Sequence, residues 1–299
     1  MRLALIANPS SGTAPDADAL EQLLGADGAE VATTPIDELT GPEGDGLAGD
    51  GLAAALRTLR AGGGPDRIVV AGGDGSIGPA ALLAAELGVP LAVLPVGTAN
   101  DFARAQGLPL DLAEAGAIAR APDAGTRHAE LALADRRPFV NAAAAGLSVA
   151  AARAARPHKP RLGPLAYTVG ALHAAVTAES LRCTVRCDGE QRFAGRAWQV
   201  VVGATGAFGG GSAIGGTDAR DRLLDVAVIP AGSRLGLVRR AYGMRSGRLT
   251  AQDDVAHERG AVVEVALAGR PAFNVDGELC RCDPARFALR PGGFEVVVA

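Results

Sequence analysis

The chain has 299 residues, of which 48% are hydrophobic and 21% charged, with a net charge of −4 and a pI near 5.6. This composition supports a sizeable buried core and excludes wholesale disorder, and the length suits two domains. The acidic balance argues against a dedicated nucleic-acid-binding protein, although a local basic patch stays compatible with it.

Neither a secretion signal nor a membrane span is expected. The N-terminal apolar run LALIA is cut short by Asn8-Pro9. The Ala-rich stretches contain Arg before they reach the roughly 18 apolar residues of a spanning helix. We therefore expect a cytoplasmic protein. Peripheral contact with the inner face of a membrane is left open, and so is a homo-oligomer.

The four cysteines form two close pairs, Cys183 with Cys187 and Cys280 with Cys282. The spacings C-x₃-C and C-x-C, without a nearby histidine, match no common zinc site. We expect reduced thiols within strands, with a zinc site as the alternative. The four histidines are scattered and form no triad pattern.

The first third of the chain alternates short apolar runs with helical patterns. Strands are expected at 3–7, 29–33, 67–71 and 91–94, helices at 16–24, 52–60 and 79–87, and a loose loop at 35–51. This βαβαβαβ alternation predicts an α/β domain in which helices cover both faces of a parallel sheet, in a Rossmann-like three-layer arrangement.

From about residue 130 the pattern changes to short β-rich runs. They occur at 182–190, 198–202, 224–229, 262–267 and 294–298, with one helix expected at 165–178. A mainly antiparallel β-sandwich or barrel is expected. The predicted domains are residues 1–128 and 129–299, and the last strand is a candidate for packing back on the first domain.

The stretch VVAGGDGSIG, residues 69–78, contains G-x-G-x-x-G between an expected strand and an expected helix. Glycines permit close backbone approach, and a helix N-terminus binds anions. A dinucleotide site would also need an acidic residue at the tip of the next strand, but that strand ends in PVGTAN. The carboxylate of Asp74 would repel a pyrophosphate unless a divalent cation lay between them. The stretch therefore favours another kind of phosphate site.

A Walker loop is absent as well, since no G-x₄-G-K-[ST] motif exists and Lys159 is the only lysine. Phosphate binding would depend on backbone amides, hydroxyls, arginine and a metal ion. Loops of this kind follow three expected strands, at 8–12, 72–76 and 95–101, and ligands bind at the carboxyl ends of parallel strands. Tight turns without a ligand are the alternative.

These segments resemble the diacylglycerol kinase catalytic domain family, and in particular the bacterial soluble lipid kinases akin to sphingosine and ceramide kinases. The matching stretches are NPSSG at 8–12, GGDGS at 72–76, PVGTANDFAR at 95–104, LAY at 165–167, GGG at 209–211, LDV at 224–226 and VDGE at 275–278. The resemblance covers essentially the whole chain. GTANDFAR and DGE are specific, whereas GGDG is shared with NAD kinases and phosphofructokinases.

The resemblance implies an α/β domain, a C-terminal β-sandwich, an active site in the cleft, and transfer of phosphate from ATP to a lipid hydroxyl with Mg²⁺. The residues it assigns to the nucleotide are Asn8, Ser10, Ser11, Gly73, Gly75, Ser76, Gly97 and Thr98, with Arg104 neutralising phosphate charge. Asp74 is expected on the metal–phosphate side, and Glu278 as the general base. Asn100 and Asp101 are expected to close the substrate side.

Two segments depart from the family pattern. Residues 141–148 lack the first Gly and the Asp of G-x-G-x-D-A. Glu130 stands where an Asp of the metal network is usual. Asp221 and Asp225 would hold a structural magnesium, but the family's Gly between them is Arg222 here. A polar loop before a strand is the alternative for this segment.

Several of these roles have structural alternatives. Asp276-Gly277 is a strong turn dipeptide, and Asp101 suits the N-cap of a helix that starts at Phe102. Arg104 suits an exposed helix position. The basic run RAARPHKPR at 153–161 suits either anionic lipid headgroups or solvent.

The sequence thus predicts an ATP-dependent lipid kinase, with diacylglycerol as the leading substrate and phosphatidic acid as the product. One alternative is a kinase of NAD or another soluble alcohol. The other is a degenerate nucleotide- or lipid-binding protein without catalysis, which the altered segments 141–148 and 221–222 favour.

Overall fold

The computed structural model describes residues 1–12, 14–40, 49–158, 163, 165–204, 207–208, 212–213, 222–233, 255–269, 272–281 and 285–299. By its internal contacts the chain divides into two compact units. The first comprises Met1–Leu131, Arg136–Val140 and Arg290–Ala299, and the second comprises Ala132–Asp135 and Asn141–Leu289.

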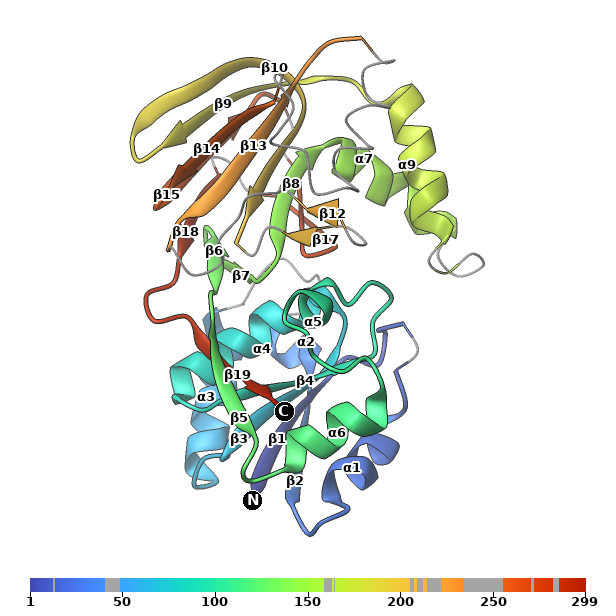
Figure 1. The fold of residues 1–299 in the computed structure, drawn as a ribbon, viewed down its shortest axis with the longest axis vertical. Helices are drawn as coiled ribbons and strands as arrows, with labels where there is room; N and C mark the ends of the chain where they lie inside the picture. Colours follow the sequence, from blue (N-terminus) through green and yellow to red (C-terminus); the bar gives the residue numbers. More distant parts are fainter. Residues whose placement is uncertain are drawn as a thin grey trace. The chain divides into compact units, whose positions relative to one another are not determined.

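The first unit is built on a six-stranded sheet in the order β2-β1-β3-β4-β19-β5. Its strands are β1 (Arg2–Ala7), β2 (Glu30–Pro35), β3 (Arg67–Gly72), β4 (Leu91–Pro95), β5 (Gly125–Ala129) and β19 (Phe294–Val298), and β7 (Arg137–Phe139) also belongs to this unit. The pairs are parallel except that β5 runs antiparallel to β19. The C-terminal strand, red in Figure 1, therefore lies between β4 and β5.

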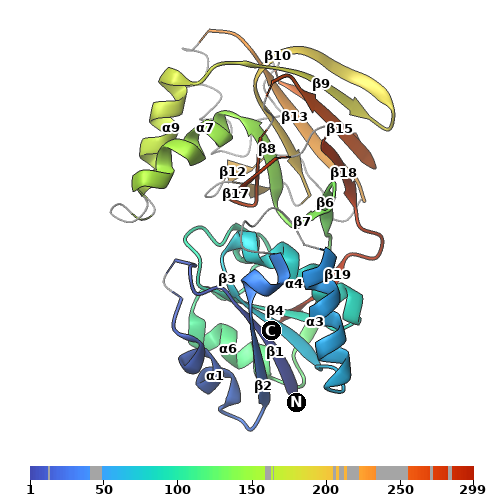
Figure 2. The same cartoon turned by 180° about the vertical axis from the view of Figure 1, so that it is seen from behind.

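Helices cover both faces of this sheet. They are α1 (Ala17–Gly25), α2 (Ile36–Thr40), α3 (Gly49–Ala61), α4 (Asp74–Leu87), α5 (Asp101–Ala105) and α6 (Leu112–Arg120). Since side chains alternate along a strand, Ile6 of β1 packs into the core shared with α2 and α4, and Leu5 into the core shared with α1 and α6. Figures 1 and 2 show α1 and α6 on one face and α3 and α4 on the other. The predicted three-layer α/β domain is confirmed.

The helix bounds correct three expectations from the sequence. Helix α4 begins at Asp74, not near Pro79, because its buried run from Ser76 to Ala84 outweighs the backbone hydrogen bond that Pro79 cannot donate. The expected loop at 35–51 contains α2, whose Ile36 and Leu39 are buried in the core, and the start of α3. Helix α6 was not expected from the sequence.

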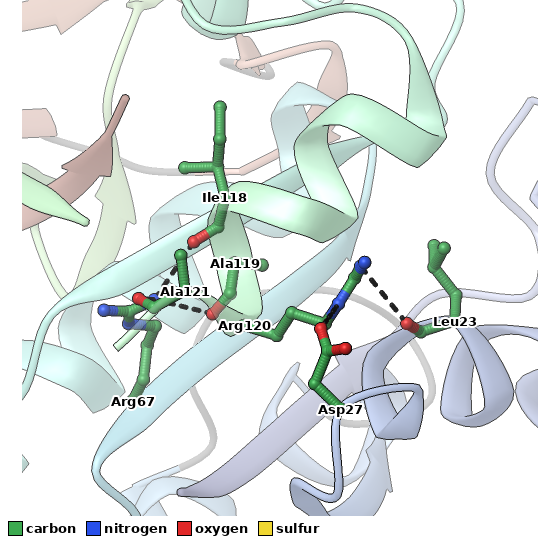
Figure 3. Close-up of polar contacts among 7 residues, drawn as sticks. All are labelled: Leu23, Asp27, Arg67, Ile118, Ala119, Arg120 and Ala121. Carbon is green, nitrogen blue, oxygen red and sulfur yellow. Dashed lines mark hydrogen bonds and ion pairs between the residues drawn. The ribbon is translucent and has the colours of Figure 1, made fainter. Parts of the chain in front are cut away.

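A buried arginine connects the start of β3 to the end of α6 in the first unit (Figure 3). Arg67, the first residue of β3, is 5% exposed. Its Nη1 donates to the carbonyl oxygens of Ile118, Ala119 and Ala121 at 3.2, 2.6 and 3.2 Å, at the C-terminal end of α6. Burial lowers the pKa of Arg67, and the charge of Asp66 opposes that shift. A cation at a helix C-terminus also interacts favourably with the helix dipole.

The second unit is mainly antiparallel β. Its strands are β6 (Ala132–Ala134), β8 (Ala142–Gly146), β9 (Leu181–Cys187), β10 (Glu190–Gly203), β11 (Ala207–Phe208), β12 (Ser212–Ala213), β13 (Leu224–Pro230), β14 (Ala256–Gly260), β15 (Val262–Leu267), β16 (Phe273–Val275), β17 (Glu278–Cys280) and β18 (Ala285–Leu289). Its helical segments are α7 (Leu147–Ala155), the 3₁₀ turn η1 (Arg156–His158) and α9 (Leu165–Thr177). Helix α7 was not expected from the sequence.

The long strand β10 holds the second unit together. Its first half pairs with β9, and its second half lies between β8 and β13. A register shift at Ala197/Gln199 marks the change of partner, as bulges do where sheets bend. Trp198 and Val201 of β10 pack in a buried cluster with Ala144 and Ile229. The antiparallel β domain predicted from the sequence is confirmed.

No helix among the described residues is long and apolar enough to cross a membrane. Cys183, Cys187 and Cys280 are buried, and Cys282 lies outside the described residues. Burial raises the pKa of Cys183 and of Cys187 to about 11. These thiols are therefore protonated near neutral pH, as the predicted strand thiols would be.

Replacing Arg67 with Met should lower the free energy of unfolding by about 3 kcal/mol, because the carbonyl oxygens that end α6 would lose a charged donor inside the protein. Urea denaturation followed by far-UV circular dichroism measures this. Arg57→Met, at an exposed position on α3, is the matched control and should stay within about 0.5 kcal/mol of the parent. Equal stability of the two variants would contradict the role of Arg67.

The buried thiols should make stability fall at alkaline pH. Both have a pKa of about 11 in the fold, against the ordinary thiol value of 9.0. The unfolded chain therefore ionises first, and the free energy of unfolding declines between about pH 9 and pH 11. Cys183→Ala/Cys187→Ala should show a shallower decline over that window than the parent. Parallel curves would show that these thiols do not contribute.

Candidate functional site in the loops of the first unit

Three loops of the first unit meet at the carboxyl edge of its parallel sheet. They follow β1, β3 and β4, which are neighbours in the sheet. The backbone N–H of Asn8 donates to the carbonyl oxygen of Ala71 at 2.9 Å, which ties the first loop to the end of β3. Ligands of open α/β sheets bind at this edge. The structure therefore brings together the three segments that the sequence singled out.

Side chains of the first loop support the second. Asn8 Nδ2 donates to Ser76 Oγ at 2.9 Å, and Ser76 is 2% exposed. Ser11 Oγ accepts from the backbone N–H of Gly73 at 2.7 Å. The backbone N–H of Ser10 donates to Asn8 Oδ1 at 3.0 Å, while the Ser10 side chain is exposed. Asn8, Ser11 and Ser76 thus shape the edge, and Ser10 faces outward.

The glycines let the loop backbones approach more closely than side chains would allow. A Cβ at Gly97 would lie 2.4 Å from the Cα of Gly73, and a Cβ at Gly12 would lie 2.5 Å from the carbonyl oxygen of Val96. Gly12 also has φ +44°, which favours glycine. A Cβ at Gly72 would lie 2.6 Å from the Cβ of Ser76. Only a glycine backbone fits at these contacts.

Asp74 connects the second loop to the third. It is the first residue of α4, and its carboxylate accepts from the backbone N–H groups of Asp101 and Phe102 at 3.1 and 2.9 Å. These are the first amides of α5. Asp74 is half-buried, and each carboxylate oxygen can accept more than one hydrogen bond. The residue thus has a positioning role in addition to the one predicted for it.

Asn100 shapes the third loop. It has φ 52° and precedes α5 as its N-cap, a position that the sequence assigned to Asp101. Its Nδ2 donates to the carbonyl oxygens of Pro95 and Gly97 at 3.1 and 3.0 Å. Asp101 is buried in the first turn of α5. The N-cap expectation was wrong by one residue because Asn tolerates the left-handed conformation that the turn requires.

The N-terminus of α4 has no side-chain cap. Its N-cap is Gly73, and Gly75 follows in the first turn. Thr98 and Arg104 are exposed, and Arg104 Nε donates to the carbonyl oxygen of Ala99 at 3.1 Å. Backbone amides at the N-terminus of a 14-residue helix, next to hydroxyls, are groups that can bind phosphate. The loop cluster therefore fits the phosphates of a nucleotide.

The fit to Mg²⁺ depends on Asp74. Within the described ranges, no three His, Cys, Asp or Glu side chains form a group that could hold a metal. Mg²⁺ is usually bound by one or two carboxylates together with substrate phosphates and water. The carboxylate of Asp74, beside the N-terminus of α4, is the type of donor that such a site uses.

Glu278 lies in the second unit, in a tight hairpin. Val275 pairs with Glu278 across β16 and β17, and the turn residues Asp276 and Gly277 have φ 47° and 93°. Positive φ at both positions defines a type I′ turn. Asp276 Oδ1 accepts from the backbone N–H groups of Asn141 and Ala142, both at 3.0 Å. The turn is thereby fixed to β8, and Glu278 is exposed at its end.

The other predicted metal ligands have different surroundings. Glu130 is buried in the first unit. Asp225 is 1% exposed in the second unit, where His257 Nε2 lies 2.7 Å and Arg259 Nε 3.4 Å from its Oδ1. Asp221 and the GGG stretch at 209–211 lie outside the described residues. The magnesium roles of Glu130, Asp221 and Asp225 remain predictions.

Sequence reasoning missed several residues that position this chemistry. Gly12 and Gly72 lie in the loops that it named, but their close approach to Val96 and Ser76 depends on strand neighbours far apart in the chain. Asp276 was treated only as a turn residue. Helix α6 carried a detectable signal, since Asp111 stands three residues before Glu114 and caps its backbone N–H at 2.9 Å.

Two family models match the chain. The model described as the diacylglycerol kinase catalytic domain matches residues 2–134. The model described as the YegS C-terminal NAD kinase beta sandwich-like domain matches residues 141–298, more than half of the chain. The chain belongs to the diacylglycerol kinase catalytic domain family. The resemblance seen in the sequence is confirmed.

Relatives of this family member are similar over most of their length. It is 32% identical to "Probable lipid kinase YegS-like" of Pseudomonas savastanoi pv. phaseolicola, over 86% of the chain and 82% of the relative. It is 29% identical to "Diacylglycerol kinase" of Mycobacterium tuberculosis, over 82% of the chain and 79% of the relative. Its fold is similar to that of a diacylglycerol kinase structure from Bacillus anthracis, with a TM-score of 0.73 and 22% sequence identity. The match covers 100% of this chain and 97% of the Bacillus chain.

Membership of this family identifies the chain as a lipid kinase. Kinase chemistry implies ATP as the phosphoryl donor, and a lipid kinase acts on a lipid acceptor. The backbone cradle of the lipid kinase's first unit is consistent with a nucleotide donor.

Gly97→Ala should lower the free energy of unfolding of this lipid kinase by about 1–3 kcal/mol, because the added methyl group would push the third loop away from Gly73. Gly25→Ala is the matched control: nothing lies within 4 Å of its Cβ position, at the end of α1. The control should be neutral or slightly stabilising. Urea titration of both variants measures the difference, and a neutral Gly97→Ala would contradict the tight loop contact.

Proposed function

We propose that this lipid kinase transfers the γ-phosphoryl group of ATP to the hydroxyl of diacylglycerol and so produces phosphatidic acid. The observation that carries the proposal is the meeting of three loops at the open N-terminus of α4, in a chain of a lipid kinase family. The name "Diacylglycerol kinase" of the mycobacterial relative supports the choice of acceptor.

The loop cluster of the first unit binds the phosphates in this proposal. Orphan amides at the start of α4 donate to phosphate oxygens, and Gly73 and Gly97 leave the phosphates room near the backbone. The exposed hydroxyls of Ser10 and Thr98 add donors, and the exposed Arg104 neutralises charge. Lysine is not required, which agrees with a chain that contains only one.

Asp74 is proposed to hold Mg²⁺ on the phosphate side. When bound, Mg²⁺ would neutralise the charge that develops on the transferred group. Because the Asp74 carboxylate also accepts two amides of α5, its position is set before ATP arrives. Preorganisation of this kind reduces the cost of reorganisation during the reaction.

Glu278 is proposed as the general base. As the lipid oxygen forms its bond to the γ-phosphorus, the bond from phosphorus to the ADP oxygen breaks, and the hydroxyl proton passes to the Glu278 carboxylate. An exposed carboxylate is a weak base, so contact with the lipid hydroxyl must desolvate it. The type I′ turn anchored to β8 holds the backbone of Glu278 in place.

The remaining parts of the proposal concern the role of each domain and the location of the protein in the cell. The domains are taken as residues 1–128 for nucleotide binding and 129–299 for the lipid. Asn100 and Asp101 close the substrate side. The protein works in the cytoplasm at the inner face of a membrane, where its substrate is found.

Glu278→Gln should reduce turnover of diacylglycerol by at least about a hundredfold, since general-base removal costs about 10²–10⁴, and should leave ATP affinity unchanged. The chain offers a matched control, because Asp188-Gly189-Glu190 repeats the D-G-E tripeptide in the β9–β10 hairpin with φ 50° and 82°. Glu190→Gln should keep full activity. Phosphatidic acid formed from labelled ATP is the measurement, and equal loss in both variants would sink the role of Glu278.

Asp74→Asn should abolish turnover and weaken binding of Mg-ATP, because it removes the charge while keeping one carbonyl oxygen for the α5 amides. Asp50→Asn, which changes a first-turn carboxylate of α3, is the control.

The same assays test the two alternative functions. Phosphorylation of NAD without phosphorylation of diacylglycerol would point to a soluble-alcohol kinase. ATP binding without turnover on diacylglycerol, sphingosine, ceramide, polyprenol or monoacylglycerol would point to a non-catalytic protein.

A further inference from the structure

Helix α9 of the second unit exposes a continuous apolar stripe. Five large hydrophobic side chains are exposed in the described part of the chain, and four of them lie on this one helix. Leu165, Val169, Leu172 and Val176 are 65%, 41%, 67% and 72% exposed. At 3.6 residues per turn the four positions fall within an arc of about 60°. Scattered exposed hydrophobic residues need no explanation, but a contiguous patch marks a contact surface.

The opposite side of α9 packs on α7, which fixes the direction of the stripe. A Cβ at Gly170 would lie 2.3 Å from the carbonyl oxygen of Ala151 and 3.0 Å from the N and Cβ of Ala155, so the two helices touch there. Ala166 and Ala174, one turn to either side of Gly170, are buried. Both views show α7 and α9 next to each other (Figures 1 and 2). The stripe therefore faces away from α7.

Exposed arginines flank this packing point. Arg153 and Arg156 are exposed at the end of α7 and the start of η1, within two residues of Ala155. Neither guanidinium has a carboxylate within ion-pair distance in the described ranges. Among residues 147–158 and 165–177, which form α7, η1 and α9, Arg153 and Arg156 are basic and none is Asp or Glu, and the exposed Glu179 lies two residues after α9. Arg153 and Arg156 therefore place positive charge beside the apolar stripe of α9.

We propose that α9, with Arg153 and Arg156, docks this protein onto a lipid bilayer that contains anionic headgroups. An interfacial helix buries an apolar face at the acyl boundary while nearby cations contact the headgroups. With 13 residues α9 is about 20 Å long, too short to span the roughly 30 Å hydrocarbon core, so it lies along the surface. A second copy of the chain suits the stripe less well, because pairing would bring like charges together.

The inference rests on the proposed function in one respect, since it explains how an enzyme reaches an acceptor dissolved in a membrane. The direct test needs no catalysis. Vesicles of phosphatidylcholine, with or without phosphatidylglycerol, are incubated with the full chain in the absence of ATP and diacylglycerol, and bound protein is measured by flotation. The parent should bind the anionic vesicles, and high salt should weaken this binding.

Leu172→Ser/Val176→Ser should bind all vesicles at least about tenfold more weakly, because two apolar side chains no longer enter the interface. Leu110→Ser is the matched control, since Leu110 is 41% exposed in the first unit, and should bind like the parent. Arg153→Ala and Arg156→Ala should each weaken binding to anionic vesicles about fivefold and leave binding to neutral vesicles unchanged. Arg57→Ala should have no effect.

The outcomes separate this inference from the proposed function. If Leu172→Ser/Val176→Ser loses turnover on diacylglycerol in vesicles but keeps it on a water-soluble short-chain diacylglycerol, docking is supported. If the parent binds vesicles but phosphorylates no lipid, docking stands and the proposed function fails. Docking is overturned if the double variant binds vesicles like the parent. It is also overturned if the parent ignores vesicles and instead forms a dimer that the double variant dissociates in sedimentation velocity.

Discussion

The close approach of the Gly73 and Gly97 backbones, where one added Cβ would lie 2.4 Å from the neighbouring Cα, sets the form of the first unit's binding edge. It forces the loops after β3 and β4 together, and Ser11, bonded to the Gly73 N–H, draws the first loop against them. Because the N-cap residue at this contact is Gly73, the N-terminus of α4 has no side-chain cap. An anion can then take the place that a cap would fill.

The same packing explains why Asp74 combines two roles. Its carboxylate bonds to the first amides of α5, so the segment 95–105 is held in place by the residue that the family pattern assigns to the metal side. Asn100 completes the arrangement from within the loop by bonding to the carbonyls of Pro95 and Gly97. Positioning and chemistry are coupled here, because moving one loop moves the acidic group.

The D-G-E tripeptide occurs twice in the second unit, and only the surrounding structure can give the two copies different roles. Both D-G-E tripeptides form turns with positive φ, and the Asp of each accepts backbone N–H groups of a neighbouring strand: Asp276 from β8, and Asp188 from Val262 at 2.9 Å. Local physics is thus the same in the two hairpins. Their difference lies in the strands that they border, and for Glu278 that strand is the altered segment that begins at Asn141.

The sequence alone determined the class of the two units and the loops that matter. Runs such as LALIA and RIVVA are buried strands because their residues are apolar and β-prone, and glycines at 72–75 and 97 mark backbone that must turn or approach closely. The order of these signals along the chain was sufficient to identify the family. Each depends on neighbours in sequence, which pattern analysis can detect.

Tertiary structure decided what lies between those signals. Helix α4 begins at Asp74 despite Pro79 because its buried face outweighs one missing hydrogen bond. The sequence offered the last strand as a candidate for packing on the first domain, and the structure gives its place, between β4 and β5. The exposed stripe of α9 is invisible in the sequence, where Leu165, Val169, Leu172 and Val176 look like a core face. Which apolar face is buried depends on the partner that packs against it, and here α7 packs against the alanine and glycine side instead.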